Sequence, residues 1–484
     1  MRNTKRIIAF LIVIACIACL MPNTLAVNSY MKLWEHVPDA EPHVFGDRVY
    51  VYGSHDVFES RMCGPNYVVW SAPVDDLTNW KYEGISFDGG ESGYLLAPDA
   101  CQGPDGKYYI YSFGDCDQAG GKGQTFCAVS DKPEGPFEYL CPVTIDGKSQ
   151  FIFDPAVLVD DDGSVYLFGG ASNIYKLDPT DMRTVIEGPY QVQEDDGKGN
   201  LKQIRDFQEG SSIRKAGDWY IFVYASKHDI TTDWLITSNF NKDYCNGTLE
   251  YAYSKNIYGP YTYGGVIIDN RGEKIETGSK SGLRWSNYSG NTHGGIEEIN
   301  GQWYVFYHRQ TNDKQTYRQA MCEPLDVTIN DEGVVIKQAE MTSQGAEKDG
   351  LKAAKKYSAG VACYLTHGAY INTDVEMNDE TTPVTNIKTG AVVGVKYVNF
   401  DEANYSIDLS IVPKGVAGYV TVALDDPANA PVATIAIPAD GDAATLTAEC
   451  GKLSGKHAVY FDFYAYSKKE ICEFVSFEFK QAAA

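Results

Sequence analysis

Apolar and polar residues alternate along most of the chain in short runs, and clusters of Gly, Asp, Asn and Pro separate these runs. Alternation with a period of two is typical of β-strands that bury one face, whereas a helix would repeat its apolar residues with a period of about 3.6. Long amphipathic helices are hard to find. The pattern therefore predicts an all-β protein, and 484 residues are enough for two folded domains.

A glycine-containing turn followed by an aromatic-rich strand occurs five times in the first 310 residues. The five turns contain Gly46, Gly106, Gly163, Gly217 and Gly301. Internal repeats of a β-rich unit are the signature of β-propellers, in which each repeat forms one blade. The repeats therefore predict a five-bladed β-propeller, which we place at residues 27–335.

One polar, ionisable residue stands upstream of each repeat at a nearly constant distance. These residues are Asp39, Asp99, Asp154, Glu209 and His293, which precede the strand tyrosine by 11, 10, 12, 11 and 11 positions. The innermost strand of each blade borders the central channel, so residues at one register of every blade point into one shared cavity. Asp and Glu also precede strands because they favour turns, but five positions with a similar offset favour a shared site.

The residue types at this register suit the cleavage of glycosidic bonds. Such a reaction needs an acid that protonates the departing oxygen and a base that activates water, and two carboxyl groups in different environments supply both. An inverting glycosidase holds them about 6.5–9.5 Å apart, which leaves room for the water. Carboxylates on different blades of a propeller can lie at such a separation.

Several short motifs occur in a characteristic order over about residues 30 to 330. They are the segments 37–45 and 50–56, Ala97-Pro-Asp, Phe153-Asp-Pro, Glu209-Gly, His293-Gly-Gly-Ile and the segment 303–309. Each motif is short, but their order and spacing make the set specific, and together they resemble glycoside hydrolase family 43. The resemblance implies a five-bladed propeller and an inverting glycosidase that acts mainly on arabinan, arabinoxylan or xylan.

The resemblance also implies roles for individual residues. Asp39 would be the general base, Glu209 the general acid, and Asp154 would raise the pKa of the acid, because a neighbouring negative charge disfavours ionisation. His293 would lie near the channel axis, where members of the family often hold a calcium ion or a water cluster. Arg309 would donate a hydrogen bond to the substrate. No cofactor is expected for the chemistry itself.

Two departures from the family pattern are visible. Leu96 stands where a tryptophan usually precedes Ala-Pro-Asp, so one expected aromatic wall of the pocket is missing. The base motif reads Asp-Ala-Glu-Pro instead of Asp-Pro, which makes Glu41 a rival for the base. We prefer Asp39, because it stands six residues before Phe45, as the family's aspartate does before its strand.

Further residues are candidates for substrate contact. His55 and Asp56 end the first aromatic strand and either line the floor of the pocket or cap the strand. Asp99 either contacts the substrate or satisfies a turn. Trp234 and Trp285 lie in polar surroundings rich in Gly, Ser and Thr, and we expect them to be sugar platforms, although tryptophan more often belongs to the core.

The family resemblance leaves the sugar open: an arabinofuranosidase, a β-xylosidase and an endo-arabinanase all fit. A non-catalytic glycan-binding propeller would have lost one of its three carboxylates, and all three are present. A retaining fructan hydrolase of the invertase-like families would begin with Asn-Asp-Pro-Asn-Gly, whereas this chain has Pro38-Asp-Ala. The last two functions are therefore the weaker alternatives.

The texture of the sequence changes after about residue 340. A polar stretch at 344–356 is followed by short strands rich in Val, Ala, Tyr and Phe, which predict a β-sandwich at 345–484. Its last strands, 455–464 and 474–479, resemble those of family 6 carbohydrate-binding modules. Its ligand-binding aromatic residues cannot be matched, so the domain either binds glycan or braces the propeller.

Residues 1–26 have the layout of a secretory signal peptide, with a basic start, an apolar run at 7–21 and small residues at 24–26. We therefore expect a secreted, extracellular or periplasmic protein. The apolar run is short for a membrane span. Cys16 follows Val-Ile-Ala, so lipoprotein anchoring is a second reading of this segment.

Charge and cysteine content narrow the partners. The net charge of −24 repels nucleic acid but is indifferent to a neutral oligosaccharide or polysaccharide substrate. Of the 12 cysteines, Cys16 and Cys19 fall in the signal segment, and the other ten form no C-x-x-C pair, which argues against a zinc knuckle. Pairing among Cys101, Cys116, Cys127 and Cys141 stays open, as does the oligomeric state.

Overall fold

The computed structural model describes residues 27–57, 60–120, 123–229, 244–276, 283–288, 291–312, 316–374 and 381–482. The predicted signal peptide at 1–26 lies outside these residues. Within them, strands dominate, and the helical segments are two short 3-10 turns, Asp117–Ala119 and Ala359–Val361. None of the described segments forms a helix that is long and apolar enough to cross a membrane.

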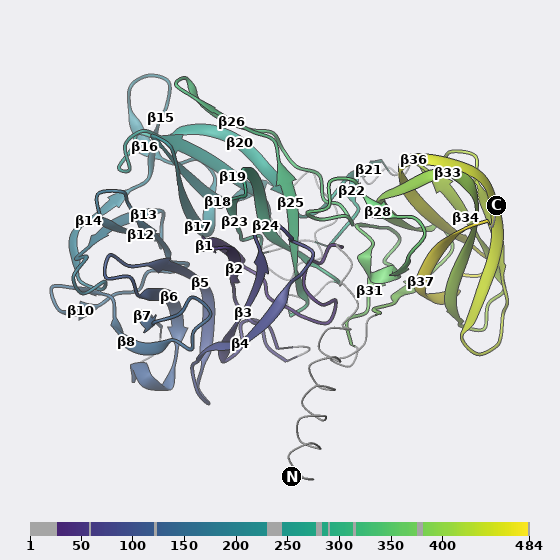
Figure 1. Cartoon of the computed structure of the whole chain (residues 1–484), viewed down its shortest axis with the longest axis horizontal. Coiled ribbons are helices and arrows are strands. Elements are labelled where there is room, and N and C mark those ends of the chain that lie inside the picture. Colours follow the sequence, from purple (N-terminus) through teal and green to yellow (C-terminus); the bar gives the residue numbers. More distant parts are fainter. Residues whose placement is uncertain are drawn as a thin grey trace, which may run out of the picture.

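Five antiparallel sheets form the blades of a propeller (Figure 1). Blade one is β1 (Glu41–Phe45), β2 (Arg48–Tyr52), β3 (Asn66–Pro73) and β4 (Lys81–Asp88); blade two is β5 (Tyr94–Gln102), β6 (Tyr108–Asp115), β7 (Gln124–Ser130) and β8 (Glu138–Pro142). Blade three is β11 (Ala156–Val159), β12 (Val165–Gly169), β13 (Asn173–Leu177) and β14 (Val185–Gln191). Blade four is β17 (Phe207–Ala216), β18 (Trp219–Asp229), β19 (Tyr244–Ser254) and β20 (Thr262–Asp269); blade five is β23 (Gly295–Ile299), β24 (Gln302–Gln310) and β25 (Arg318–Leu325).

The inner strands close a ring, because β1 contacts both β5 and β23, β17 contacts both β11 and β23, and β5 contacts β11. Four small hairpins decorate the blades: β9 (Thr144–Ile145) with β10 (Lys148–Ser149), β15 (Gln193–Asp195) with β16 (Leu201–Gln203), β21 (Lys274–Glu276) with β22 (Leu283–Trp285), and β26 (Val327–Asn330) with β27 (Gly333–Ile336).

The aromatic repeat has a packing reason. Each gap between neighbouring blades holds its own hydrophobic cluster, and the second strands supply much of it. Tyr50 and Tyr52 of β2, for example, pack with Phe126 of β7 between blades one and two. Large rings fill the wedge that widens away from the axis and bury much apolar surface per residue. The predicted five-bladed propeller is thereby confirmed.

The blade topology gathers one set of loops on one rim. In a four-stranded antiparallel blade the last strand ends at the level where the first strand began, and the chain then passes to the next inner strand. The segments that precede β1, β5, β11, β17 and β23 therefore lie on the same rim, together with the loops between second and third strands. Four of the five residues with the constant offset, Asp39, Asp154, Glu209 and His293, lie at or near this rim, whereas Asp99 lies within β5.

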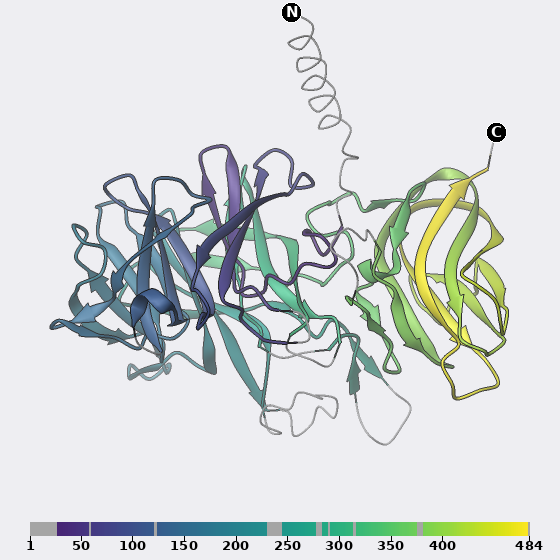
Figure 2. The same cartoon turned by 90° about the horizontal axis from the view of Figure 1, so that it is seen from below.

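The C-terminal part forms a separate sheet domain (Figure 2). Its strands are β28 (Leu351–Lys352), β29 (Lys356–Ser358), β30 (Tyr364–Leu365), β31 (Tyr370–Ile371), β32 (Val384–Ile387), β33 (Ala391–Pro413), β34 (Gly418–Leu424), β35 (Ala433–Ile437), β36 (Ala444–Tyr464) and β37 (Cys472–Gln481). Phe461, Phe474 and Phe477 meet in its core. The predicted class, an all-β propeller followed by a β-sandwich domain, is confirmed.

The sheet domain is joined to the fifth-blade side of the propeller by backbone hydrogen bonds. Leu365 N–H donates to the carbonyl of Ser286 at 2.7 Å, and Ile371 N–H donates to that of Thr311 at 3.0 Å. Leu33, from the start of the described chain, packs into the core of the sheet domain. The two domains therefore meet in an interface at these residues, which is called the seam below.

Candidate active site

Two of the predicted carboxylates stand directly before inner strands in an unusual backbone conformation. Asp39 precedes β1 with φ 59°, and Asp154 precedes β11 with φ 46°. Asp tolerates this left-handed region better than most residues, and such conformations cluster at functional sites. Both side chains are inside the rim, because each residue is only 5% exposed.

Asp39 is held by an arginine from the fifth blade. Nη1 of Arg318, the first residue of β25, donates to Oδ1 of Asp39 at 2.9 Å and to Oδ2 at 3.1 Å. Burial by itself would raise the pKa of Asp39, but Arg318, followed by His308 and His293, outweighs burial and lowers it. Asp39 is therefore ionised at neutral pH, which is the state that a general base needs.

The same guanidinium also holds Asp56. Arg318 Nε donates to Oδ2 of Asp56 at 2.9 Å, and Nη2 donates to Oδ1 at 2.7 Å. The backbone N–H of Cys63 occupies Oδ1 as well, at 2.9 Å. Asp56 is 4% exposed and both of its oxygens are bonded to protein groups. It therefore holds Arg318 in place and does not line the floor of the pocket, in contrast to one of the two expectations from the sequence.

Asp154 and Glu209 come from the neighbouring blades three and four, and the charge of Glu209 acts on Asp154. Glu209 lies near the start of β17 and is partly exposed, and the N–H of Gly210 donates to Oδ2 of Asp154 at 2.9 Å. The pairing of β17 with β18 is irregular between Glu209 and Ser212, and such a bulge re-aims a side chain. Burial, followed by the charges of Glu209 and Asp39, raises the pKa of Asp154 well above its usual range.

Gly210 is needed at this point for two reasons. Its φ of 70° lies in the left-handed region, and a Cβ there would stand 3.1 Å from the ring of His293. The glycine therefore lets β17, Asp154 and His293 approach closely. This is a physical reason for the Glu209-Gly pair that the sequence analysis singled out.

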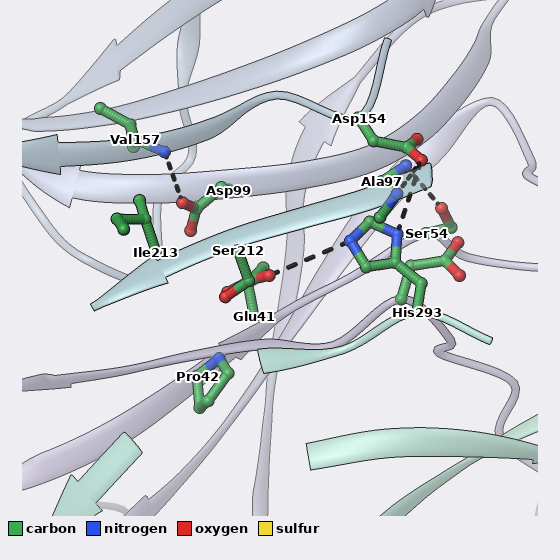
Figure 3. A network of polar contacts seen from close by, with 12 residues as sticks. Glu41, Pro42, Ser54, Ala97, Asp99, Asp154, Val157, Ser212, Ile213 and His293 are labelled. Atoms are coloured by element: carbon green, nitrogen blue, oxygen red, sulfur yellow. Dashed lines mark hydrogen bonds and ion pairs between the residues drawn. The ribbon is translucent and has the colours of Figure 1, made fainter. Parts of the chain in front are cut away.

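His293 lies between Asp154 and Glu41 (Figure 3). Its Nδ1 is 3.9 Å from Oδ2 of Asp154, and its Nε2 is 4.0 Å from Oε1 of Glu41. Among the described residues, neither His293 Nε2 nor Glu41 Oε1 has a hydrogen-bond partner, although both are buried. A water molecule or a cation that lies beside these two atoms, and not on the line between them, could contact both.

Glu41 sits in a different environment from Asp39. Its Oε2 accepts from Ser212 Oγ at 3.0 Å and from Arg214 Nη2 at 2.9 Å. Burial and the nearby Asp99 nevertheless raise the pKa of Glu41 to about 8, against the opposing effect of Arg214. Glu41 is therefore mostly protonated at neutral pH.

Asp99 has no free oxygen for a substrate. It is fully buried; Oδ1 pairs with Nε2 of His43 at 2.6 Å and accepts from the N–H of Ala100 at 2.7 Å. Oδ2 accepts from the N–H of Val157 at 2.7 Å. The expectation of a substrate contact is thus wrong, and Asp99 satisfies buried backbone and ties blades one, two and three together.

Potential metal ligands lie in two places near the axis. Glu41, His43 and Asp99 place ligand atoms within 4.8 Å of one another, but the bonds just described already use the oxygens of Asp99. His293 Nε2 and Glu41 Oε1 have no hydrogen-bond partner among the described residues, so both atoms are available as metal ligands. Calcium binds six to eight ligands, mostly oxygens, so an ion held by these two side chains would complete its shell with water.

Arg309 was expected to reach the substrate, and the structure contradicts this. The side chain is fully buried, and its Nη2 donates to the carbonyl of Gly360 at 2.7 Å and to Oε1 of Gln319 at 2.9 Å. Its Nη1 donates to the carbonyl of Ala362. Arg309 thus binds the sheet domain, and Arg318 is the arginine at the pocket.

The remaining candidates divide further. His55 is half-buried, with Nδ1 2.8 Å from Asn66 Oδ1 and Nε2 3.2 Å from Glu35 Oε1, so its polar atoms are occupied by protein. The guanidinium of Arg271 lies 3.6 Å from the ring centre of Trp285 and covers one face of that ring. Trp234 lies outside the described residues.

Comparison with known families matches these features. A model of glycosyl hydrolases family 43 matches residues 35–333, and a model of carbohydrate binding module family 6 matches residues 362–481. A xylosidase/arabinosidase of Thermoclostridium stercorarium is 34% identical over 418 residues, which cover 76% of this chain and 82% of that protein.

An arabinoxylan arabinofuranohydrolase of Paenibacillus polymyxa is 24% identical over 482 residues, which cover 89% of this chain and 71% of that protein. Among solved structures, a calcium-free β-xylosidase/α-arabinofuranosidase from a compost microbial metagenome, in complex with xylotriose, is 25% identical with a TM-score of 0.48. The likeness covers 64% of this chain and 96% of that one.

Proposed function

The chain belongs to glycosyl hydrolases family 43, and we propose that it is an inverting glycosidase that releases arabinofuranose or xylose from plant pentosans. The names of its relatives, xylosidase/arabinosidase and arabinoxylan arabinofuranohydrolase, support this choice of substrate. We also propose that the protein is exported, because residues 1–26 have the layout of a signal peptide.

In the proposed reaction, Asp39 takes a proton from water as the water oxygen attacks the anomeric carbon. Glu209 donates its proton to the glycosidic oxygen as that bond breaks on the opposite face of the sugar. The configuration is inverted because only one displacement occurs. Asp154 and the partly exposed Glu209 hold a proton between them until this step, because two adjacent carboxyl groups do not ionise together easily.

The observation that carries the proposal is that the surroundings of Asp39 and of Asp154 shift their pKa values in opposite directions. Arg318 lowers the pKa of Asp39, whereas burial and the charge of Glu209 raise that of Asp154. Asp39 is thus the ionised group that suits a base, whereas the neighbouring Asp154 and Glu209 retain a proton, which Glu209, the more exposed of the two, can donate. The same reasoning favours Asp39 over Glu41 as the base, since the pKa of Glu41 is raised to about 8.

The chemistry needs no cofactor in this proposal. A calcium ion held by His293 and Glu41 would supply positive charge at the axis, which would keep Glu41 ionised. His293, held between Asp154 and Glu41, then orients the carboxylates above it. Its part is to position, since Asp39 and Glu209 carry both proton transfers.

The test replaces the proposed acid. Glu209→Ala is expected to lower turnover of arabinoxylan by about 10³-fold, because a general acid contributes about 10²–10⁴-fold. A nitrophenyl arabinofuranoside or xyloside, whose leaving group needs little protonation, should retain much more activity. The matched control is Gln208→Ala, a change at the exposed neighbouring residue. Near-full activity of Glu209→Ala on arabinoxylan, or retained configuration in early products by proton NMR, would contradict the proposal.

A further inference from the structure

A phenylalanine on the catalytic rim is left largely in water. Phe151 is 68% exposed and stands three residues before Asp154, so the two Cα atoms are at most about 11 Å apart. It is not an isolated surface residue. Its ring packs edge-on against Phe113 with centroids 4.4 Å apart, and Phe113 packs in the same way against Phe153 at 5.4 Å.

This group of three rings, Phe113, Phe151 and Phe153, adjoins one wall of the pocket. Phe113 lies at the rim end of β6, directly opposite Leu96 of β5. Residues opposite each other in an antiparallel pair share a face of the sheet. Leu96 is followed by Ala97, whose N–H donates to Ser54 Oγ beside the catalytic carboxylates (Figure 3). The rings thus extend a wall to which Leu96 itself contributes no aromatic face.

The exposed ring is held in place by its backbone. The N–H of Thr125 donates to the carbonyl of Gln150 at 3.0 Å, and Thr125 Oγ1 bonds to both the N–H and the carbonyl of Ile152, at 2.6 and 2.9 Å. Residues on both sides of Phe151 are therefore fixed. A Cβ at Gly123 would stand 3.5 Å from the Phe151 ring, so the ring lies against bare backbone on that side.

We propose that Phe151, backed by Phe113 and Phe153, is a stacking platform for a sugar ring of the polysaccharide beyond the bond that is cut. An aromatic face binds the C–H face of a neutral pyranose without needing charge, and a ring that is already fixed loses little entropy on binding. The ligand is a main-chain pentopyranose unit. The proposal rests on the proposed function, because it extends the same site outward.

The platform makes a prediction about substrate length. A polymer reaches both the pocket and the platform, whereas a nitrophenyl pentoside fills only the pocket. Phe151→Ala is therefore expected to lower the ratio of kcat/KM on arabinoxylan to kcat/KM on the nitrophenyl pentoside by about tenfold, mainly through KM on the polymer, since lost uniform binding raises KM. Phe151→Trp should restore the ratio.

The control is Tyr190→Ala, which removes another exposed aromatic residue, 46% exposed, from the outer strand β14 and should leave the ratio unchanged. An unchanged ratio in Phe151→Ala would overturn the platform. Affinity of the wild type and Phe151→Ala for xylo-oligosaccharides, measured by calorimetry, separates the two proposals. If the wild type cleaves no pentosan, the proposed function fails, and the platform stands only if Phe151→Ala still weakens oligosaccharide binding about tenfold.

Discussion

Blade five carries two fully enclosed arginines on neighbouring strands, and they are bonded to different kinds of partner. Arg318 on β25 binds the carboxylates of Asp39 and Asp56 at the rim. Arg309 on β24 binds carbonyl groups of the sheet domain and the amide of Gln319. Arg318 lies opposite Gln310, and Arg309 lies opposite Gln319, so one strand pair serves the pocket on one face and the seam on the other.

The difference appears in the direction in which the pKa of each guanidinium group is shifted. Burial lowers the pKa of Arg309 to about 10, because its partners are neutral. At Arg318, burial acts in the same direction, but Asp39 and Asp56 outweigh it and raise the pKa. The buried Arg318 lowers the pKa of Asp39, although burial still leaves the pKa of Asp56 raised, whereas Arg309 supplies hydrogen-bond geometry to carbonyl groups. The first arrangement suits catalysis and the second suits assembly.

The largest effect is expected from Arg318→Met. The change leaves two buried carboxylates without a cation, which costs about 3–5 kcal/mol in the free energy of unfolding. The pKa of Asp39 should rise, so the acidic limb of the kcat/KM profile should move to higher pH, and activity at neutral pH should fall by about 10³-fold. Thermal unfolding and a pH–rate profile measure both effects.

Arg318→Lys is the matched control, since it keeps the charge but loses the two-sided fork. It should recover part of the stability and leave the acidic limb nearer its original position. If Arg318→Met kept the wild-type pH profile, the arginine would not set the ionisation of the base, and the contrast with Arg309 would fail.

The propeller was predictable because the repeated aromatic residues have a repeated task, which is to fill the gaps between blades. The gathering of Asp39, Asp154, Glu209 and His293 on one rim follows from the same regularity. Asp99 shares the offset but is turned inward, because β5 is irregular between Leu96 and Asp99 and Ala97 has φ 25°. A count along the chain does not reveal such a bulge.

The contacts of Arg309 and Arg318 could not be predicted from the repeat in this way. Arg309 ends a motif that resembles the family's, yet its direction depends on Gly360 and Ala362 of the sheet domain, which lie 51 and 53 positions later. Arg318 pairs with Asp39 across 279 positions. The one local signal is a charged residue within a mostly buried strand, RQAMCEPL, since a buried charge requires a partner.

Arg309→Met tests the other side of the comparison. It removes the donors to two carbonyls at the seam, and buried unsatisfied groups cost about 1–3 kcal/mol each, so the free energy of unfolding should fall by about 2–6 kcal/mol. Well below the unfolding temperature, kcat on a nitrophenyl pentoside should stay within about twofold of the wild type, because the side chain lies away from the proposed base and acid.

Scanning calorimetry and initial rates, with the half-exposed Arg183→Met as control, separate stability from catalysis. A fall in kcat comparable to that of Arg318→Met, with the unfolding temperature unchanged, would return Arg309 to the pocket and remove the distinction between the two arginines.

Another buried arginine, Arg214, lies between these two cases. Its partner Glu41 is a carboxyl group, but the pKa of Glu41 is raised to about 8, so it is mostly uncharged at neutral pH. The native state then binds this proton more tightly than the unfolded chain, whose glutamate titrates near pH 4.3. The proton on Glu41 therefore stabilises the native state fully below about pH 4.3, and this stabilisation is lost as the pH rises toward 8. Glu41→Gln mimics the protonated form, so its unfolding temperature should vary less between pH 5 and 8 than that of the wild type.

The same variant gives the smallest expected change in rate. Its amide can keep the bonds to Ser212 and Arg214 and turn its N–H group toward Nε2 of His293, which has no hydrogen-bond partner in the described part of the chain. We expect kcat/KM at pH 6 to fall less than about tenfold, against about 10³-fold for Asp39→Asn. If Glu41→Gln instead lost activity as Asp39→Asn should, with its unfolding temperature intact, Glu41 would be the base, and Arg214 would take the role assigned to Arg318.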